Sequence, residues 1–452
     1  MMTLLIKNQT LRALVLLSIT MLSTACKVMG PDYVRPEIKT PVAYKEAVAP
    51  TEQATKRIED HWWMLYGNEE LDQLIAQVEL QNYSLQALEA RTRQARALAE
   101  IAKAAQSPTV VAGGQNDLGI LASWEVDLWG RVKRNIEASG ATAQASKDDL
   151  AAMKLSLQAQ LAQNYFNLRV QDAEILLLQD STLAYERLLK VTQNQYAVGV
   201  TDRSNVLQVQ TQLNIAQSQI QEARANRAQL EHAIAVLIGK APADFSIAVA
   251  AITTSVPEVP ATLPADLLLR RPDIAAAERR VASANAKIGE AEAAGYPSLD
   301  LFAGVSIRKG LLGGAKVLAP LYSNGAIHAN RSQASAVYDE AVANYQQAAL
   351  NGFREVEDNL ATLQSLSIAA DHKAEGIKTA HQSLTIMHNQ QQVGIINHHA
   401  MMMAQTAALD GEKAGLDILA KRLIASVNLI KALGGGWQSA AQDTADIPAA
   451  TK

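Results

Sequence analysis

Proline and aromatic residues are scarce in this chain of 452 residues. None of its 13 prolines lies between residues 108 and 242 or between residues 320 and 448. Proline inside a helix costs roughly 3 kcal/mol or more, so these two stretches permit very long helices. Aromatic residues make up only 4% of the chain, which argues against a thick globular core. This composition favours long helices that pack closely through small side chains.

The chain has a single cysteine, Cys26, which excludes an intrachain disulfide. Lys7 and Arg12 precede an apolar segment at 13–22 that is too short to cross a bilayer as a helix. Small residues then lead to Cys26, as in a bacterial lipoprotein signal that is cleaved before an acylated cysteine. Ser23 stands where that pattern prefers leucine, so an ordinary secretory signal is the alternative. We expect lipidation of Cys26.

Charge and motifs exclude several classes of function. The net charge is −4, and it becomes −6 if residues 1–25, with their two positive charges, are removed. Basic residues are not concentrated, so nucleic-acid binding has no support. The sequence has no GxSxG, P-loop, GxGxxG or HExxH motif, which argues against an enzyme and predicts no cofactor.

Histidine and methionine are clustered at 381–403, which holds four of the eight His and four of the ten Met. Such side chains bind soft metals such as Cu(I). The spacing matches no recognised metal motif, however, and Met401 fits a heptad pattern. We therefore predict no metal site here. We interpret Met401 as part of the apolar contact between helices and the histidines as part of a solvent-exposed helix face.

The chain is internally duplicated. "VTQNQYAVGV" at 191–200 returns as "IMHNQQQVGI" at 386–395, an offset of 195. The same offset relates Gly130, Asn135, Gly199 and Gly239 to Gly325, Asn330, Gly394 and Gly434. Upstream the offset is 189, so that Ala87, Glu89, Arg91, Ala95 and Pro108 match Ala276, Glu278, Arg280, Ala284 and Pro297. A repeat of this kind predicts two equivalent structural units.

Each unit is predicted to contain a helical hairpin. A helix from 131 to about 194 would be ~95 Å long, at 1.5 Å per residue. Gly199 and Gly394 permit the reversal, and returning helices are predicted at 203–238 and 398–433. Apolar residues repeat every three or four positions along the first returning helix, with Arg227 as the polar interruption, and Arg422 is its equivalent in the second. This period indicates a coiled coil, whereas a plain helical bundle is the alternative. The seam residues are Val206, Val209, Leu213, Ala216, Ile220, Ala223, Leu230, Ile234 and Leu237 in the first copy, and Met401, Ala404, Ala408, Gly411, Gly415, Ile418, Ala425, Leu429 and Ala432 in the second.

Short strands are predicted between the helices. Alternating apolar residues around Gly-rich turns indicate β-hairpins at about 108–129 and 297–324. The segments expected along the chain are a signal at 1–25, an extended segment at 26–60, a first repeat at 61–239, a linker at 240–264, a second repeat at 265–437 and a disordered tail at 438–452.

Several segments together resemble the TolC-like outer membrane factors, and specifically their lipoprotein branch. They are "GPDYVRP" (30–36), "WWMLYGNEELDQLIAQVELQNYSLQALEAR" (62–91), "ASWEVDLWGRVKR" (122–134), "LLLRRPDIAAAERRVASANAKIGEAEAAGYPSL" (267–299), "REVEDNLATL" (354–363) and "ALGGGW" (432–437). The resemblance implies a homotrimer, mostly α with a small β part. Three chains would form a periplasmic α-barrel of helical hairpins, and four short strands per chain would join one twelve-stranded outer-membrane β-barrel.

The resemblance also implies a function and two kinds of site. The function is passive export of drugs or other small solutes that an inner-membrane pump and a periplasmic adaptor deliver. In the family the adaptor docks near the hairpin tips, which here are Val198, Gly199, Val200 and Thr201, and Val393, Gly394 and Ile395. In the family, carboxylates that follow the second tip glycine ring the closed periplasmic end of the channel, which is its gate. Here those positions are Ala400 and Met403, and the equivalent positions of the first repeat are Asn205 and Gln208. Closure of the gate is then expected from pairing of Asp202 with Arg203 and from packing of Met401 and Met403.

Three alternatives remain open at this point. The same duct would serve a one-step protein secretion system or a heavy-metal cation efflux system. A periplasmic coiled-coil scaffold without a channel is the more distant alternative. The short hairpins, of which the first must fit between Pro108 and Gly130, are a departure from the family pattern and predict a squat barrel or a defective one.

Overall fold

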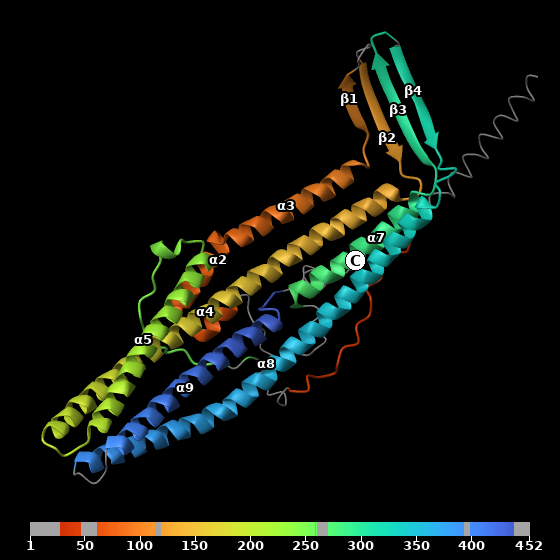
Figure 1. Ribbon diagram of the computed structural model, residues 1–452. Helices are drawn as coiled ribbons and strands as arrows, with labels where there is room; N and C mark the ends of the chain where they lie inside the picture. Colours follow the sequence, from red (N-terminus) through yellow and green to blue (C-terminus); the bar gives the residue numbers. More distant parts are fainter. Residues whose placement is uncertain are drawn as a thin grey trace, which may run out of the picture. The chain divides into compact units, whose positions relative to one another are not determined.

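The computed structural model describes residues 28–46, 61–113, 119–257, 259, 270–308, 310–392 and 398–437. Helices dominate this part of the chain, and four short strands form its only sheet (Figure 1). The predicted class, mostly α with a small β part, is confirmed. Predictions for residues 1–27 with Cys26, for Val393, Gly394 and Ile395, and for 438–452 lie outside the described residues.

The duplication is visible in the lengths of the helices. Helices α4 (Arg131–Ala197) and α8 (Ala326–Gln392) both have 67 residues, and α5 (Arg203–Leu237) and α9 (His398–Ala432) both have 35. The starts of each pair differ by the offset of 195 (326 − 131 and 398 − 203). Helices α3 (Tyr83–Ala104) and α7 (Pro272–Ala293) both have 22 residues, and their starts differ by the offset of 189 (272 − 83). The two offsets found in the sequence therefore relate equivalent helices.

The remaining helical elements lie outside this repeat pattern. They are the 3-10 turn η2 (Trp62–Tyr66), helix α2 (Glu69–Gln81) and the 3-10 turn η3 (Pro242–Asp244). Asn68 caps α2, because its side chain accepts the backbone N–H of Leu71 at 3.0 Å. Trp62 and Tyr66 of η2 are both buried and pack tightly.

The chain divides into two compact units. One unit takes residues up to 39 together with 87–151 and 272–350, and contains the sheet and α7. The other takes 40–86, 152–271 and 351–452, and contains α2, α5 and α9. Both long helices, α4 and α8, contribute residues to each unit. These units do not follow the two sequence repeats, because every unit holds segments of both.

The sheet is an antiparallel meander in the order β1, β2, β3, β4. Its strands are β1 (Thr109–Gly113), β2 (Gly119–Val126), β3 (Ser298–Ser306) and β4 (Gly310–Leu318). The central pair joins the two repeats, because β2 comes from the first and β3 from the second. In the described chain β1 and β4 each pair on one side only, which leaves two edges for a further strand.

Both returning helices end in the same way. Gly239 and Gly434 have φ of 72° and 94°, and the two backbone N–H groups at each end bond back to carbonyls three and five positions earlier. This is the Schellman pattern, which favours glycine because of the positive φ. A side chain then binds the last helical carbonyl of each helix: Asn82 Nδ2 donates to Leu237 at 2.8 Å and Arg271 Nη1 to Ala432 at 3.1 Å. Asn82 and Arg271 are themselves related by the upstream offset of 189 (271 − 82).

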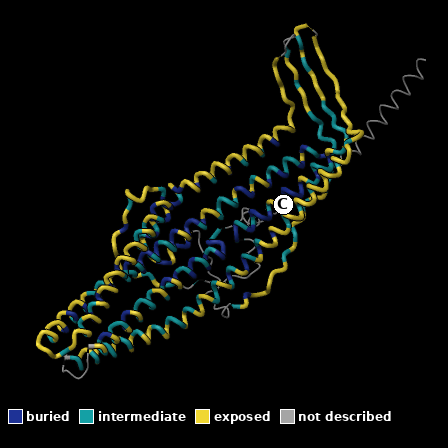
Figure 2. The backbone as a smooth tube through the Cα atoms, viewed as in Figure 1, coloured by how far each residue is buried: buried dark blue, intermediate teal, exposed yellow. Residues whose placement is uncertain are grey.

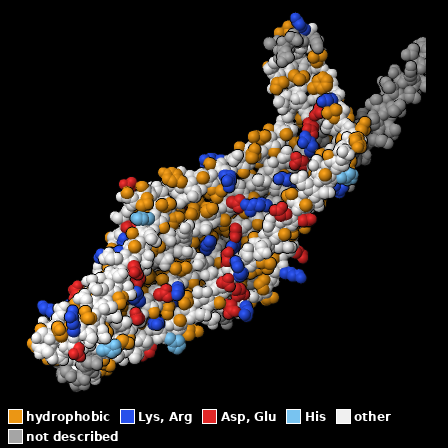
Figure 3. All heavy atoms as spheres, in the orientation of Figure 1, with side chains coloured by type: hydrophobic (Ala, Val, Ile, Leu, Met, Phe, Trp, Pro, Cys, Tyr) orange, Lys and Arg blue, Asp and Glu red, His pale blue; other side chains and the backbone are white. Residues whose placement is uncertain are grey.

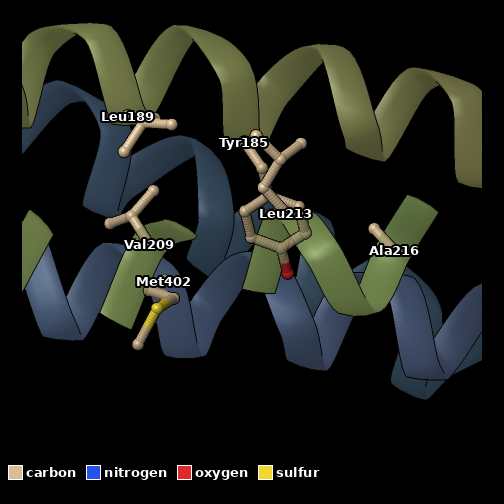
Figure 4. Close-up of a cluster of buried hydrophobic side chains, with 6 residues drawn as sticks. All are labelled: Tyr185, Leu189, Val209, Leu213, Ala216 and Met402. Carbon is tan, nitrogen blue, oxygen red and sulfur yellow. The ribbon is translucent and has the colours of Figure 1, made fainter. Parts of the chain in front are cut away.

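The core of the first helical hairpin follows the predicted seam. Of its nine seam residues all but Val206 and Leu230 are buried, and those two are half-buried. Three helices meet near the hairpin end, where residues of α4, α5 and α9 form one buried cluster (Figure 4). The cluster comprises Tyr185, Leu189, Val209, Leu213, Ala216 and Met402.

The seam predicted for α9 is only partly right. Ala408, Ala425, Leu429 and Ala432 are buried as predicted, but Met401 and Gly411 are only half-buried, and Met402 and Leu409 beside them are buried instead. The reason is that α9 packs against more than one helix. Met402 and Leu409 pack against α4 and α5, while Gly411 and Gly415 lie against Ile377 of α8. A helix with two contact faces does not show a single heptad stripe.

Candidate functional site

One face of the sheet is entirely apolar. Residues paired across the four strands share a face, and most of these side chains are exposed, Leu311 to 83%. Figure 2 shows the strands as exposed or intermediate along their length. The members of this face are Val110, Ala112, Ile120, Ala122, Trp124, Val126, Leu299, Leu301, Ala303, Val305, Leu311, Gly313, Ala315 and Val317. A contiguous exposed apolar face of this kind marks a surface that meets lipid or protein.

The opposite face of the sheet is mixed. Glu125, Asp300 and Lys316 lie side by side in one row near the helical end of the sheet, where Figure 3 shows charged side chains gathered. Farther along, glycines alternate with a few large residues, and the Phe302 ring covers Gly314, where an added Cβ would come within 2.8 Å of the ring. One face therefore suits hydrocarbon and the other suits water.

Aromatic side chains mark the end of the sheet next to the helices. Trp129 stacks on Tyr296 with ring centroids 4.7 Å apart, and its Nε1 donates to the Pro297 carbonyl at 2.8 Å. Trp124 Nε1 donates to the Gln106 carbonyl at 3.0 Å, and Arg131 pairs with Glu125. A cavity of about 460 Å³ opens beside the stacked pair. Amphipathic aromatic side chains at such a boundary are typical of a membrane interface.

The N-terminal segment is fixed to the same end of the sheet. Met29 N–H donates to the Trp129 carbonyl at 3.0 Å, and the buried Arg134 donates to the carbonyls of Met29 and Gly30 at 3.0 and 3.1 Å. Arg134 also pairs with Asp32 at 3.0 Å. Val28 packs so closely on Gly130 that an added Cβ would lie 2.6 Å from its Cγ1. From Val28 onward, the segment that follows Cys26 is thus held beside Trp129 and Tyr296, which form the aromatic boundary at the helical end of the sheet.

The first hairpin tip presents exposed apolar side chains on a turn that backbone hydrogen bonds close. Gly199 has φ of 76°, its N–H donates to Tyr196 and that of Val200 to Gln195, so α4 also ends in a Schellman pattern. Val198 and Val200 are 74% and 72% exposed. The turn is supported further by Asn205 Nδ2, which donates to Thr201 Oγ1 at 2.8 Å.

The structure places the expected gate residues near the starts of α5 and α9. Asp202 is the N-cap of α5 but its side chain makes no capping hydrogen bond, and no ion pair joins it to Arg203 within the described chain. Asn205 and Ala400 are half-buried, Gln208 is exposed, and Met403 is 57% exposed. The methionine that packs inside is Met402. The roles of these residues remain predictions.

A buried charge network, which the sequence had not revealed, links α4 and α5. Asp172 is fully buried and accepts from Arg169 at 2.8 Å and from Arg227 at 2.6 Å. Burial lowers the pKa of Arg169, but its bonds with Tyr165 and Glu70 outweigh burial and raise that pKa above its usual value. The network also holds the segment after α5, because Arg227 donates to the Ile247 carbonyl at 2.6 Å. Arg227 had stood out in the seam, but its acidic partner is distant in the sequence and gave no signal.

In the part of the chain that the structure describes, no helix combines the length and apolar character needed to cross a membrane. The same residues contain no group of three or more His, Cys, Asp or Glu side chains arranged to hold a metal ion.

Comparison with known proteins identifies the class of protein. Residues 74–240 and 263–435 match the outer membrane efflux protein family. The pyoverdine export outer membrane protein OpmQ of Pseudomonas aeruginosa is 30% identical over 427 residues, which cover 85% of this chain and 89% of OpmQ. The cation efflux system protein CusC of Escherichia coli is 25% identical over 447 residues, covering 92% of this chain and 96% of CusC.

Solved structures agree with this fold. The outer-membrane channel OprN superposes with a TM-score of 0.83 at 25% identity, covering 91% of this chain and 99% of OprN. The Campylobacter jejuni CmeC outer membrane channel has a TM-score of 0.84 at 20% identity, covering 93% and 98%, and shares the fold.

The chain therefore belongs to the outer membrane efflux protein family. It is the outer-membrane channel component of a tripartite efflux system, extends into the periplasm, and is not an enzyme. As such a component it works with a periplasmic adaptor and an inner-membrane pump.

Proposed function

We propose that three copies of this chain form the channel and that it exports drugs or other small organic solutes. The observation that carries this proposal is the sheet, which has one apolar face, one mixed face and two open edges. Strand edges in lipid must be paired, because hydrocarbon offers the backbone no hydrogen bonds. Three four-stranded sheets that pair β4 with β1 of the next copy close into a twelve-stranded sheet. The apolar face then meets lipid and the row of Glu125, Asp300 and Lys316 meets the aqueous lumen.

Lipidation of Cys26 adds an anchor at the level of the headgroups. Support comes from the contacts of Met29 and Gly30 with Arg134, which hold the chain close to Trp129 and Tyr296. An acyl chain on Cys26 would enter the bilayer where the aromatic boundary lies. This anchor would supplement the insertion of the sheet into the membrane.

The hairpin tips are the proposed docking site of the adaptor. Val198, Gly199, Val200 and Thr201 form the first tip, and Val393, Gly394 and Ile395 the second. The exposed valines of the first tip stand on a turn that Gly199 fixes by its positive φ. Exposed apolar side chains gathered at one place typically mark a surface that meets another protein or lipid. Asp202, Arg203, Asn205, Gln208, Ala400 and Met403 surround the proposed periplasmic gate.

The names of two relatives indicate two different classes of cargo. OpmQ is named for pyoverdine export and CusC for cation efflux. We favour small organic solutes, since the pump selects the cargo and the chain supplies the duct. A cation efflux system or a protein secretion system is the second candidate, because the same duct suits either.

A pair of substitutions on opposite faces of β2 and β3 tests the channel. Val305→Lys places a charge on the apolar face and should abolish trimer recovery from outer membranes, because a lysine in hydrocarbon costs about 2–4 kcal/mol per copy. Ser123→Lys on the mixed face should preserve the trimer and shift the conductance in planar bilayers toward anions. Equal tolerance of both changes, or a wild-type protein recovered as a water-soluble monomer without conductance, would contradict the proposal.

A further inference from the structure

The second helical hairpin contains a cavity at the position where the first hairpin is filled. The cavity has a volume of about 490 Å³ and lies between α8, α9 and a short part of α4. Its wall includes Ala370, Lys373 and Gly415. Subtracting 195 from these numbers gives Ile175, Leu178 and Ile220 in the first hairpin. Those three side chains belong to one buried apolar cluster.

The second copy has lost apolar side-chain volume at this position, which contributes to the cavity. Ile175 corresponds to alanine and Ile220 to glycine, so the second hairpin lacks two branched side chains that fill the first. Helices α8 and α9 approach closely here, since a Cβ added to Gly415 would lie 2.8 Å from Ile377. This close approach does not fill the space that the missing side chains leave, and the space beside Gly415 stays open. The remaining walls are apolar, and include Leu177, Leu416 and Leu419.

The two hairpins also differ in the charged residues at this position. Leu178 of the first hairpin corresponds to Lys373 in the second. Arg227 corresponds to Arg422, but the acidic partners Asp172 and Glu231 correspond to Ser367 and Ser426. Ser426 is already bonded to Tyr66. Arg422 lines the cavity, and its Nε is buried with no hydrogen-bond partner in the described structure.

An unpaired buried guanidinium N–H is costly, so it points to an absent acceptor. The one carboxylate in the cavity wall, Glu412, is paired with His381. Lys373 and Arg422 therefore leave an excess of positive charge next to an apolar surface. Anions with an apolar body suit such a surface, because Arg and Lys bind carboxylate, sulfonate or phosphate groups and apolar walls bind the rest.

We propose that this cavity binds an amphipathic organic anion. The head of the anion accepts from Arg422 and Lys373, and its apolar body fills the space that Ile175 and Ile220 occupy in the first hairpin. The volume falls within the range of ordinary small-molecule sites. All lining residues belong to one of the two compact units, so the site is complete within one chain and does not depend on the proposed trimer.

The test uses the full-length protein in amphipol and the probe 1-naphthoate, measured by isothermal titration calorimetry. Wild type should bind 1-naphthoate and should not bind 1-naphthylmethylammonium, which has the same ring and the opposite charge. Arg422→Gln and Lys373→Gln should each weaken naphthoate binding about tenfold or more, since a hydrogen bond to a charged group contributes roughly 1.5–3 kcal/mol. Lys421→Gln is the matched control, because Lys421 precedes Arg422, is exposed and pairs with Asp417. It should leave binding unchanged.

A second variant keeps the test decisive if loss of Arg422 impairs folding. Ala370→Ile restores the side chain of the first hairpin and should abolish binding while the thermal midpoint stays at or above that of wild type. Ser367→Asp offers Arg422 the carboxylate that Arg227 has, and should weaken naphthoate binding by competition. Undiminished binding to Ala370→Ile and to Arg422→Gln, or no binding to wild type, would overturn the proposal.

Two sources of the natural anion are separable. Organic extraction and mass spectrometry of the purified channel should recover a lipid-like acid from wild type and not from Ala370→Ile if a membrane lipid is the occupant. If nothing is recovered and naphthoate binds, an exported solute is the occupant. Conductance of Ala370→Ile should match wild type in either case, which separates failure of this inference from failure of the proposed channel.

Discussion

The two helical hairpins have equal lengths and different interiors. Helices α4 and α8 agree in length to the residue, and so do α5 and α9. The first hairpin is filled by Ile175, Leu178 and Ile220 and neutralises Arg227 with Asp172, whereas the second has an open cavity and an unneutralised Arg422. Helix length sets where the turn of each hairpin lies, while the side chains between the helices are free to diverge. The two copies therefore had to keep their lengths equal, whereas one copy could lose the apolar packing and the ion pair inside it.

The largest expected difference between the hairpins follows removal of the buried carboxylate. Asp172→Ala removes the buried carboxylate that Arg169 and Arg227 share and leaves each arginine with one acidic partner, Glu70 or Glu231. This loss should lower the free energy of unfolding by about 3 kcal/mol. The equivalent change Ser367→Ala should have almost no effect, because Ser367 is exposed. Chemical denaturation in detergent measures both. If both variants lost a similar amount of unfolding free energy, the two hairpins would be stabilised alike, contrary to the difference described above.

The helix ends should behave in the opposite way, with equal effects in both copies. Gly239→Ala would place a Cβ 2.4 Å from the Gln81 carbonyl oxygen, and Gly434→Ala one 2.0 Å from that of Arg270. Both glycines also have positive φ. We expect each variant to lower the unfolding free energy by roughly 2–3 kcal/mol, measured in the same way. A loss confined to one variant would mean that the two ends are not equivalent.

The tip glycine should have a smaller effect on stability than on docking. Gly199 has positive φ but no atom within 4 Å of an added Cβ, so Gly199→Ala adds only backbone strain of about 1–2 kcal/mol. Gly140→Ala is the control, because Gly140 lies inside α4 with open space around it and alanine there should stabilise by up to about 1 kcal/mol. Co-purification with the adaptor should weaken for Gly199→Ala and stay unchanged for Gly140→Ala. Retained adaptor binding in both would remove the tip from the interface.

The smallest expected effect depends on pH. Burial raises the pKa of Asp148 to about 6, although Lys147 and Arg279 act to lower it. The folded chain therefore binds this proton more tightly than the unfolded chain, and stability falls as the pH rises from about 4 to about 6. Asp148→Asn should raise the unfolding free energy by up to about 1 kcal/mol at pH 7 and leave it unchanged at pH 4, after allowance for solvent screening of this half-exposed side chain. The equivalent position is Ala343, so the second repeat supplies no such group. A pH-independent difference would exclude Asp148 as the cause.

Sequence patterns predicted the repeats and missed contacts that depend on more than one partner. Proline-free stretches and the two offsets predicted the long helices, since breakers and glycines act locally. The seam of α5 was right because α5 buries one stripe. The seam of α9 was partly wrong because Met402 and Leu409 face α4 and α5 while Gly411 and Gly415 face α8. The pairing of Asp172 with Arg227 and the cavity at Arg422 required three-dimensional proximity of distant residues, which no local pattern encodes.

The pairing of β2 with β3 has a consequence for biogenesis. Gly119 pairs with Ser306, and the whole first helical hairpin lies between them in the sequence, so the strand that covers β2 is synthesised long after β2 itself. Until then the first β-hairpin exposes an apolar face and an unpaired edge, both of which promote aggregation in an aqueous compartment. Contacts this distant along the chain also form slowly. The first β-hairpin of the nascent chain therefore stays prone to aggregation until β3 is available, whereas the helices can form earlier.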